Sequence, residues 1–192
     1  MGFPYLVVGG IGKAVEDTVF PVTPDYTGMG SIWEDEGGAT TNLYQSVNSA
    51  NDSTYVTLQS VIPETVICGT STEDHNFRAN MDTPDGEPLG RQTVYVTVRA
   101  KYDGGGATGE SHTMEIELIE GATTQRAQGS GFNLTESIAD YEYFLTPAEI
   151  NSVTDWSDID AKATITSCAG NSVANARDQQ LFIYQVKIDF EQ

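Results

Sequence analysis

The chain has 192 residues, of which 39% are apolar, so it is long enough to bury one hydrophobic core without disulfides or metal ions. It contains 28 Asp and Glu against 9 Lys and Arg, which gives a formal net charge of −19 at pH 7. This acidity argues against binding to the phosphate backbone of nucleic acids and against electrostatic contact with anionic lipid. The sequence has no run of about 18 apolar residues that would predict a membrane span.

Residues 1–25 are predicted to form an N-terminal arm or an edge strand. Their apolar start lacks the basic region of a secretory signal, and the glycines that follow make the backbone too flexible to fold alone. The segment therefore either pairs into the sheet of its own chain or packs on a neighbouring subunit. The side chains expected at such an interface are Phe3, Tyr5, Leu6, Val7, Val8 and Ile11.

Apolar and polar side chains alternate with a period of two through most of residues 26–192, which is typical of half-buried strands. In the segment 92–101, valines occupy one face, and the opposite face carries Thr93, Tyr95, Thr97, Arg99 and Lys101. The same alternation recurs at 55–68, 112–120, 140–145, 159–167 and 180–191. Turn-forming residues separate these segments at 34–41, 82–90, 103–109, 128–131 and 169–176. The pattern predicts an all-β fold, a jelly-roll-like antiparallel β-sandwich that forms a single domain over residues 26–192.

One short helical turn is predicted near residues 147–153. Thr146 is the expected N-cap, Pro147 occupies the first helical position, and Glu149 follows the cap by three residues, which is the pattern of a capping box. Trp156 comes shortly afterwards, and we expect its indole to be buried at the end of the sandwich. Thr146, Glu149 and Trp156 are thus assigned structural roles.

Few residues in the chain are suited to catalysis. Neither His75 nor His112 lies near a nucleophile motif, and the sequence has no phosphate-binding or dinucleotide-binding fingerprint. Cys68 and Cys168 do not form a C-x-x-C pair, and cytosolic synthesis favours free thiols over a disulfide. We therefore expect no catalytic residues and a protein that is not an enzyme.

Calcium is the one cofactor for which the sequence offers a weak candidate site. Asp82, Asp85 and Glu87 place oxygen ligands around a turn, as Ca²⁺ prefers. Pro84, Asp85 and Gly86 already form a complete turn signal without an ion, so a turn alone is the favoured interpretation.

Five segments carry a resemblance to a known family when they are taken in order. They are the Ser31–Trp33 loop, the acidic strand start at 51–56, VYVTVRA at 94–100, LTPAEI at 145–150 and TDWSDI at 154–159. Together they resemble the small β-sandwich modules in virion structural proteins of tailed phages and related prokaryotic viruses. In that family, an "LT..E" helical turn followed by "TDWSDL" leads into a central strand.

The resemblance implies a virion structural protein that decorates or stabilises the capsid, or that belongs to the tail or a fibre. Such a protein is made in the host cytoplasm and resides on the particle. Its expected partners are further copies of itself, with a trimer favoured, and other virion proteins such as the major capsid protein. The alternative is a carbohydrate-binding module, with or without stabilisation by calcium, based on the sandwich pattern, the Asp82–Glu87 turn and a sugar-stacking surface of Trp33 and Tyr44. Core packing is the favoured interpretation of these two aromatic residues.

Overall fold

The computed structural model describes residues 17–22, 33–48, 51–58, 76–86, 88, 92–104, 111–169 and 179–191. Within these ranges the chain forms ten strands and two short helices: β1 (Asp17–Val19), β2 (Trp33–Asp35), α1 (Tyr44–Val47), β3 (Val56–Leu58), β4 (Asn76–Asn80), β5 (Thr93–Gly104), β6 (Ser111–Glu120), β7 (Thr124–Asn133), β8 (Ala139–Phe144), α3 (Pro147–Ser152), β9 (Ile159–Ala169) and β10 (Gln179–Glu191). The candidate arm from Phe3 to Ile11, Cys68, the side chain of Cys168, and Glu87 lie outside the described residues.

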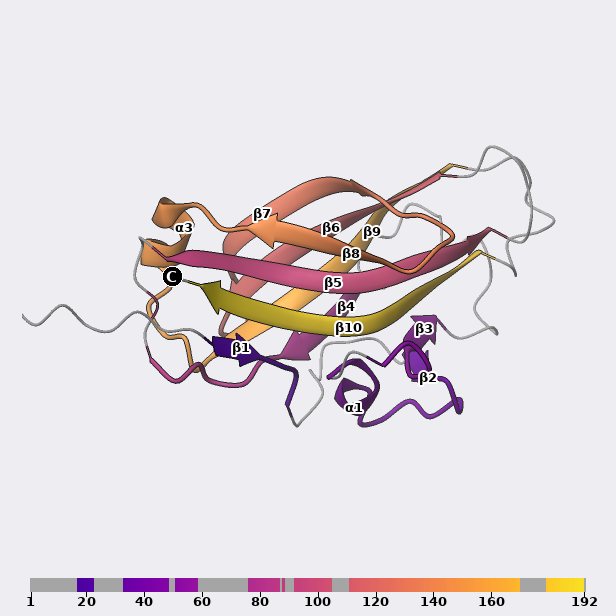
Figure 1. Cartoon of the computed structure of the whole chain (residues 1–192), viewed down its shortest axis with the longest axis horizontal. Coiled ribbons are helices and arrows are strands. Elements are labelled where there is room, and N and C mark those ends of the chain that lie inside the picture. Colours follow the sequence, from indigo (N-terminus) through magenta and orange to yellow (C-terminus); the bar gives the residue numbers. More distant parts are fainter. Residues whose placement is uncertain are drawn as a thin grey trace, which may run out of the picture.

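The strands form two sheets whose pairings are all antiparallel. The first sheet has six strands in the order β2-β3-β10-β5-β8, and β1 also pairs with β10. The second sheet has the order β4-β9-β6-β7. In Figure 1, β8, β5 and β10 lie in front of β7, β6, β9 and β4, and α3 sits at one end of the molecule. The predicted all-β antiparallel sandwich is confirmed. Separately, neither helix in the described part of the chain has the length or hydropathy to cross a membrane.

The inward faces of the two sheets share one hydrophobic core. The valines of the predicted strand at 92–101 all point inward from β5, and they meet buried side chains of β6, β9 and β10. Trp33 is fully buried in this core, where its ring meets Phe77 edge-on at 5.4 Å and its Nε1–H donates to the Asn76 carbonyl at 2.9 Å. The sequence placed Trp33 in a loop, but it opens strand β2.

The predicted turn at 128–131 is wrong, because these residues lie inside β7. Gly129 is required there by close packing with the neighbouring strand β8. A Cβ on Gly129 would lie 2.2 Å from Cδ2 of Tyr143, so a larger residue would displace that ring. Gly131 has a φ of +79°, a conformation that side chains other than glycine rarely adopt. Both glycines therefore serve the strand and its packing.

The helix α3 contains the predicted capping box. The Glu149 backbone N–H donates to the Thr146 hydroxyl at 3.3 Å, and the Thr146 backbone N–H donates to the Glu149 carboxylate at 2.7 Å. Pro147 occupies the first turn, where its missing N–H costs nothing. After α3 the chain turns into β9, which pairs with β4 on one side and β6 on the other and is therefore a central strand.

Replacing Thr146 by alanine is expected to lower the free energy of unfolding by about 1 kcal/mol, since it removes the side-chain cap and leaves a helix N–H unpaired. Thr146→Ser retains the hydroxyl and serves as the matched control, with a loss well below that of alanine. Urea unfolding of the two variants and the wild type measures the difference. Equal midpoints for alanine and serine would show that the cap does not stabilise this end of the sandwich.

Candidate binding surface

The turn proposed for calcium makes hydrogen bonds of its own. Asp82 accepts from the Thr83 N–H at 2.8 Å, and the Asp85 N–H donates to the Asp17 carboxylate at 2.9 Å, which ties the turn to β1. Both Asp82 and Asp85 are exposed. Among the residues that the structure describes, no three His, Cys, Asp or Glu side chains come close enough together to hold a metal ion.

The favoured interpretation of Trp33, core packing, is confirmed, and the alternative of a sugar-stacking surface with Tyr44 is wrong because Trp33 has no exposed surface. Tyr44 is half-buried on α1, and its hydroxyl accepts a hydrogen bond from Gln45 at 2.8 Å. An exposed aromatic surface in this protein therefore has to come from other residues.

The TDWSDI segment is docked onto the turn between β6 and β7. The Glu120 carboxylate accepts from the Thr154 N–H at 3.0 Å, from the Thr154 hydroxyl, and from Nε of Arg126 at 2.6 Å. Burial by itself raises the pKa of Glu120, but these hydrogen bonds outweigh it and hold the pKa below its ordinary value. Trp156 is buried and meets Phe190 edge-on at 5.5 Å.

Asp160, the residue that follows this segment in β9, forms a buried ion pair with Arg78 of β4. The Arg78 guanidinium donates through Nε to Asp160 at 2.8 Å and also to the backbone carbonyls of Gly121 and Ala122 at 2.6 and 2.8 Å. Asn80 donates to the second Asp160 oxygen at 3.0 Å. The ion pair thereby fixes β4, β9 and the β6–β7 turn to one another.

Glu149 connects α3 to both sheets. It accepts a hydrogen bond from the Tyr143 hydroxyl at 2.7 Å and another from the backbone of Gln128 in β7. Partial burial acts to raise the pKa of Glu149, and the bonds from Tyr143, Thr146 and Gln128 lower it overall. Burial, together with the bond to Glu149, raises the pKa of Tyr143 to about 12. Because Gln128 lies on the outermost strand of its sheet, Glu149 also covers part of a free strand edge.

A different surface gathers polar and aromatic side chains on the outward side of the first sheet. We call it the polar-aromatic face, and it is the outward side of β10, β5 and β8 together with the turn before β3. Its residues are Asp52, Tyr55, Tyr95, Thr97, Arg99, Lys101, Asp140, Glu142, Phe144, Phe182, Tyr184, Lys187 and Asp189. Seven of these are outward positions of the strand pattern at 92–101 and of its neighbour at 140–145.

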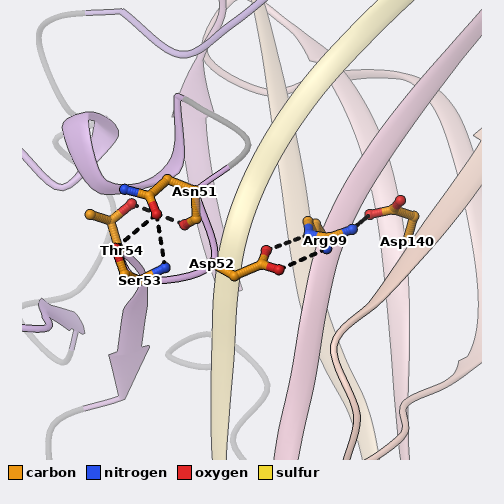
Figure 2. Close-up of polar contacts among 6 residues, drawn as sticks. All are labelled: Asn51, Asp52, Ser53, Thr54, Arg99 and Asp140. Carbon is orange, nitrogen blue, oxygen red and sulfur yellow. Dashed lines mark hydrogen bonds and ion pairs between the residues drawn. The ribbon is translucent and has the colours of Figure 1, made fainter.

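Arg99 is the centre of an ion-pair bridge across this face. Its Nε and Nη2 donate to the two Asp52 oxygens at 2.7 and 3.0 Å, and Nη1 donates to Asp140 at 2.9 Å. Figure 2 shows Asp52 and Asp140 on opposite sides of the guanidinium. Because β10 lies between β3 and β5, the Asp52 contact spans β10 and joins the 51–55 turn to the middle of the sheet.

The turn that carries Asp52 is shaped by its own neighbours. The Asn51 side-chain oxygen accepts from the backbone N–H and the hydroxyl of Ser53 at 3.1 and 2.8 Å, and the Asn51 carbonyl accepts from the Thr54 N–H at 3.2 Å (Figure 2). The hydrogen bonds from Arg99 lower the pKa of Asp52, so this carboxylate keeps its charge to a lower pH than an isolated Asp does.

Aromatic rings lie near both ends of the polar-aromatic face. At one end Phe144 is 53% exposed and packs against Tyr95 with ring centroids 4.8 Å apart, while the Tyr95 hydroxyl donates to Glu191 at 2.8 Å. At the other end Tyr55 meets Phe182 and Tyr184 edge-on at 5.1 and 5.7 Å.

The polar groups between these rings provide both donors and acceptors. The Lys101 ammonium lies 5.2 Å from the centre of the Phe182 ring, and Lys187 pairs with Asp189 at 2.8 Å. Glu142 and Asp140 are exposed on β8. Partly exposed rings, as at Tyr95, Phe144 and Phe182, together with fixed polar groups on paired strands are suited to binding a ligand.

Comparison with known proteins finds no matching family model and no matching curated protein. Solved structures give remote similarities. An arabinose-bound α-L-arabinofuranosidase is 15% identical at a TM-score of 0.44, and the match covers 92% of this chain and 26% of the enzyme. The second N-terminal cellulose-binding domain of β-1,4-glucanase C from Cellulomonas fimi is 16% identical at a TM-score of 0.45, covering 93% and 99% of the two chains. The K1 cleaved adhesin domain of Lys-gingipain from Porphyromonas gingivalis W83 is 11% identical at a TM-score of 0.37. That match covers 92% of this chain and 95% of the adhesin domain. These similarities are too remote to bear on function.

Proposed function

We propose that this protein is a non-enzymatic structural subunit of a virus particle, located on the capsid surface or in the tail. The observation that carries the proposal is the segment from Leu145 to Asp160. In the sequence it resembles the helical turn and TDWSDL stretch of phage β-sandwich modules. In the structure it forms a capped helical turn that leads into the central strand β9, as the resemblance implies.

The polar side chains of this segment are engaged in holding the sandwich together. Thr146 and Glu149 cap α3, Thr154 binds Glu120, and Asp160 pairs with Arg78. Asp155 accepts from the Ser157 N–H and hydroxyl at 2.9 and 2.6 Å. Because these polar groups bind within the chain, they support a role for the motif in stabilising the fold rather than in catalysis.

The net charge of the chain makes its assembly depend on salt, and assembly is favoured under saline conditions. At −19 per chain, copies repel one another at low ionic strength, and salt screens this repulsion. The expected partners are other copies of the chain, with a trimer favoured, and the major capsid protein.

The proposal predicts that the protein is a stoichiometric component of purified particles. Particles from a culture that produces this protein are banded on a density gradient, and mass spectrometry measures its copy number relative to the major capsid protein. We expect a copy number in the range of other structural subunits. Host ribosomal proteins in the same fraction define the background, and a level no higher than theirs would contradict the proposal.

A carbohydrate-binding activity is the second candidate, and the polar-aromatic face favours it. A subunit exposed on a particle can have both properties, so the two candidates require separate tests.

A further inference from the structure

We propose that the polar-aromatic face binds a neutral polysaccharide chain that lies along β5. The inference rests on the second candidate function and specifies its ligand and its place on the sheet, and it does not depend on a structural role in a particle. The inference rests on the placement of the rings, on the polar groups between them and on the charge of the face.

The rings are spaced for an extended ligand. Tyr95 and Lys101 are six residues apart on β5, which corresponds to about 20 Å along a strand. Tyr95 contacts Phe144 at one end, and Lys101 lies over Phe182 at the other. Sugar rings present flat C–H faces that pack on aromatic side chains, so a chain of several sugars meets rings at both ends.

The middle of the face offers hydrogen-bonding groups that are already fixed. The Arg99 bridge holds Asp52 and Asp140 in place, while their side chains are still 48% and 47% exposed. A planar guanidinium between two carboxylates presents donors and acceptors side by side, which is what neighbouring sugar hydroxyls require. Because the groups are held before binding, little ordering is needed when a ligand arrives.

Thr97 adds an independent observation at the centre of the face. It is paired across the sheet with Lys187 on one side and Glu142 on the other, and only 1% of its surface is exposed. Its hydroxyl is buried and has no hydrogen-bond partner in the described part of the chain. Buried polar atoms are normally paired, and a ligand reaches this hydroxyl only when the side chains that cover it move aside.

The charges favour a neutral ligand. Arg99 is neutralised by two carboxylates and Lys187 by Asp189, so these cations of the face are already paired within the chain. The net charge of −19 repels anionic polysaccharides. Phe144 is the one exposed large hydrophobic side chain among the described residues, which is less apolar area than the core of a protein interface requires.

Affinity electrophoresis of the full chain in gels containing soluble β-glucan, xyloglucan, galactomannan or dextran tests the proposal, with alginate as the anionic comparison. We expect at least one neutral polysaccharide to retard the wild type and alginate not to do so. Phe144→Ala and Arg99→Met should each weaken that binding about tenfold or more. Gln125→Ala removes an exposed side chain of β7 in the other sheet and should bind as the wild type does.

Urea unfolding and sedimentation of each variant accompany the binding measurement. Unchanged unfolding midpoints for Phe144→Ala and Arg99→Met attribute the loss of binding to the face itself. Retention of full affinity by both variants would overturn the proposal, and so would a wild type that binds no neutral polysaccharide or only alginate. A Phe144→Ala variant that dissociates an oligomer without any glycan effect would identify the face as a contact between copies, which also overturns it. None of these outcomes depends on whether the protein is found in particles.

Discussion

Replacing Arg78 by leucine is expected to lower the free energy of unfolding by about 3–5 kcal/mol, which is a large part of the stability of a domain of this size. The side chains of Arg78 and Asp160 are only 8% and 6% exposed, and the guanidinium also satisfies the carbonyls of Gly121 and Ala122. The leucine variant leaves a buried carboxylate without its counter-charge and removes the hydrogen bonds from Arg78 to two backbone carbonyls. Urea unfolding measures the loss.

Two further variants separate the buried charge from the lost packing. Arg78→Leu combined with Asp160→Leu removes both charges and should recover much of the stability, because a buried pair replaced as a unit costs far less than one partner removed alone. Arg99→Met breaks an ion pair on the exposed face and should cost no more than about 1 kcal/mol. If the single variant Arg78→Leu unfolds at the same urea concentration as Arg99→Met, the buried pair does not organise the second sheet.

Replacing Trp156 by alanine is expected to cost about 3–5 kcal/mol, because it leaves a cavity where a large ring is now packed. Trp156 is 8% exposed and contacts Phe190 of β10 from the connection between α3 and β9, so it joins this end of the sandwich to the first sheet. Phe144→Ala is the matched control. Its ring is 53% exposed, and its loss should change the stability by no more than about 0.5 kcal/mol.

Urea unfolding followed by circular dichroism compares these two aromatic variants. A Trp156→Ala midpoint equal to that of Phe144→Ala would show that the indole does not anchor the sandwich. A large loss for Phe144→Ala would instead mean that the exposed ring is part of the stabilising core, and its use as a binding residue would have to be reconsidered.

Elements that depend on local sequence patterns, namely the alternating strands and the capped helical turn, were predictable from the sequence. Alternation over 92–101 placed the valines inside and Tyr95, Arg99 and Lys101 outside, since successive side chains of a strand point to opposite faces. The Thr146–Glu149 capping box is likewise local, because both partners lie within one helical turn. These features need only a few neighbouring residues to define them.

Three strands were missed: β2, which has only three residues, and β4 and β7, whose patterns depend on distant partners. Arg78 makes β4 appear polar, yet its side chain is buried by an ion pair with Asp160, which lies 82 residues away. Gly129 and Gly131 make β7 resemble a turn, while Gly129 instead accommodates the Tyr143 ring of another strand. Residue type alone cannot distinguish these uses, because the contact that decides them is formed only in the folded chain.

The sequence by itself determined an acidic all-β sandwich with alternating strands and a capped turn. The tertiary structure alone decided which outward residues share a surface. Phe144 and Tyr95 are 49 positions apart, and Asp52 and Arg99 are 47 apart, but antiparallel pairing of β5 with β8 and β10 brings them to one face. Strand order and register fix such neighbours, and they follow from the packing of the whole chain rather than from any local pattern.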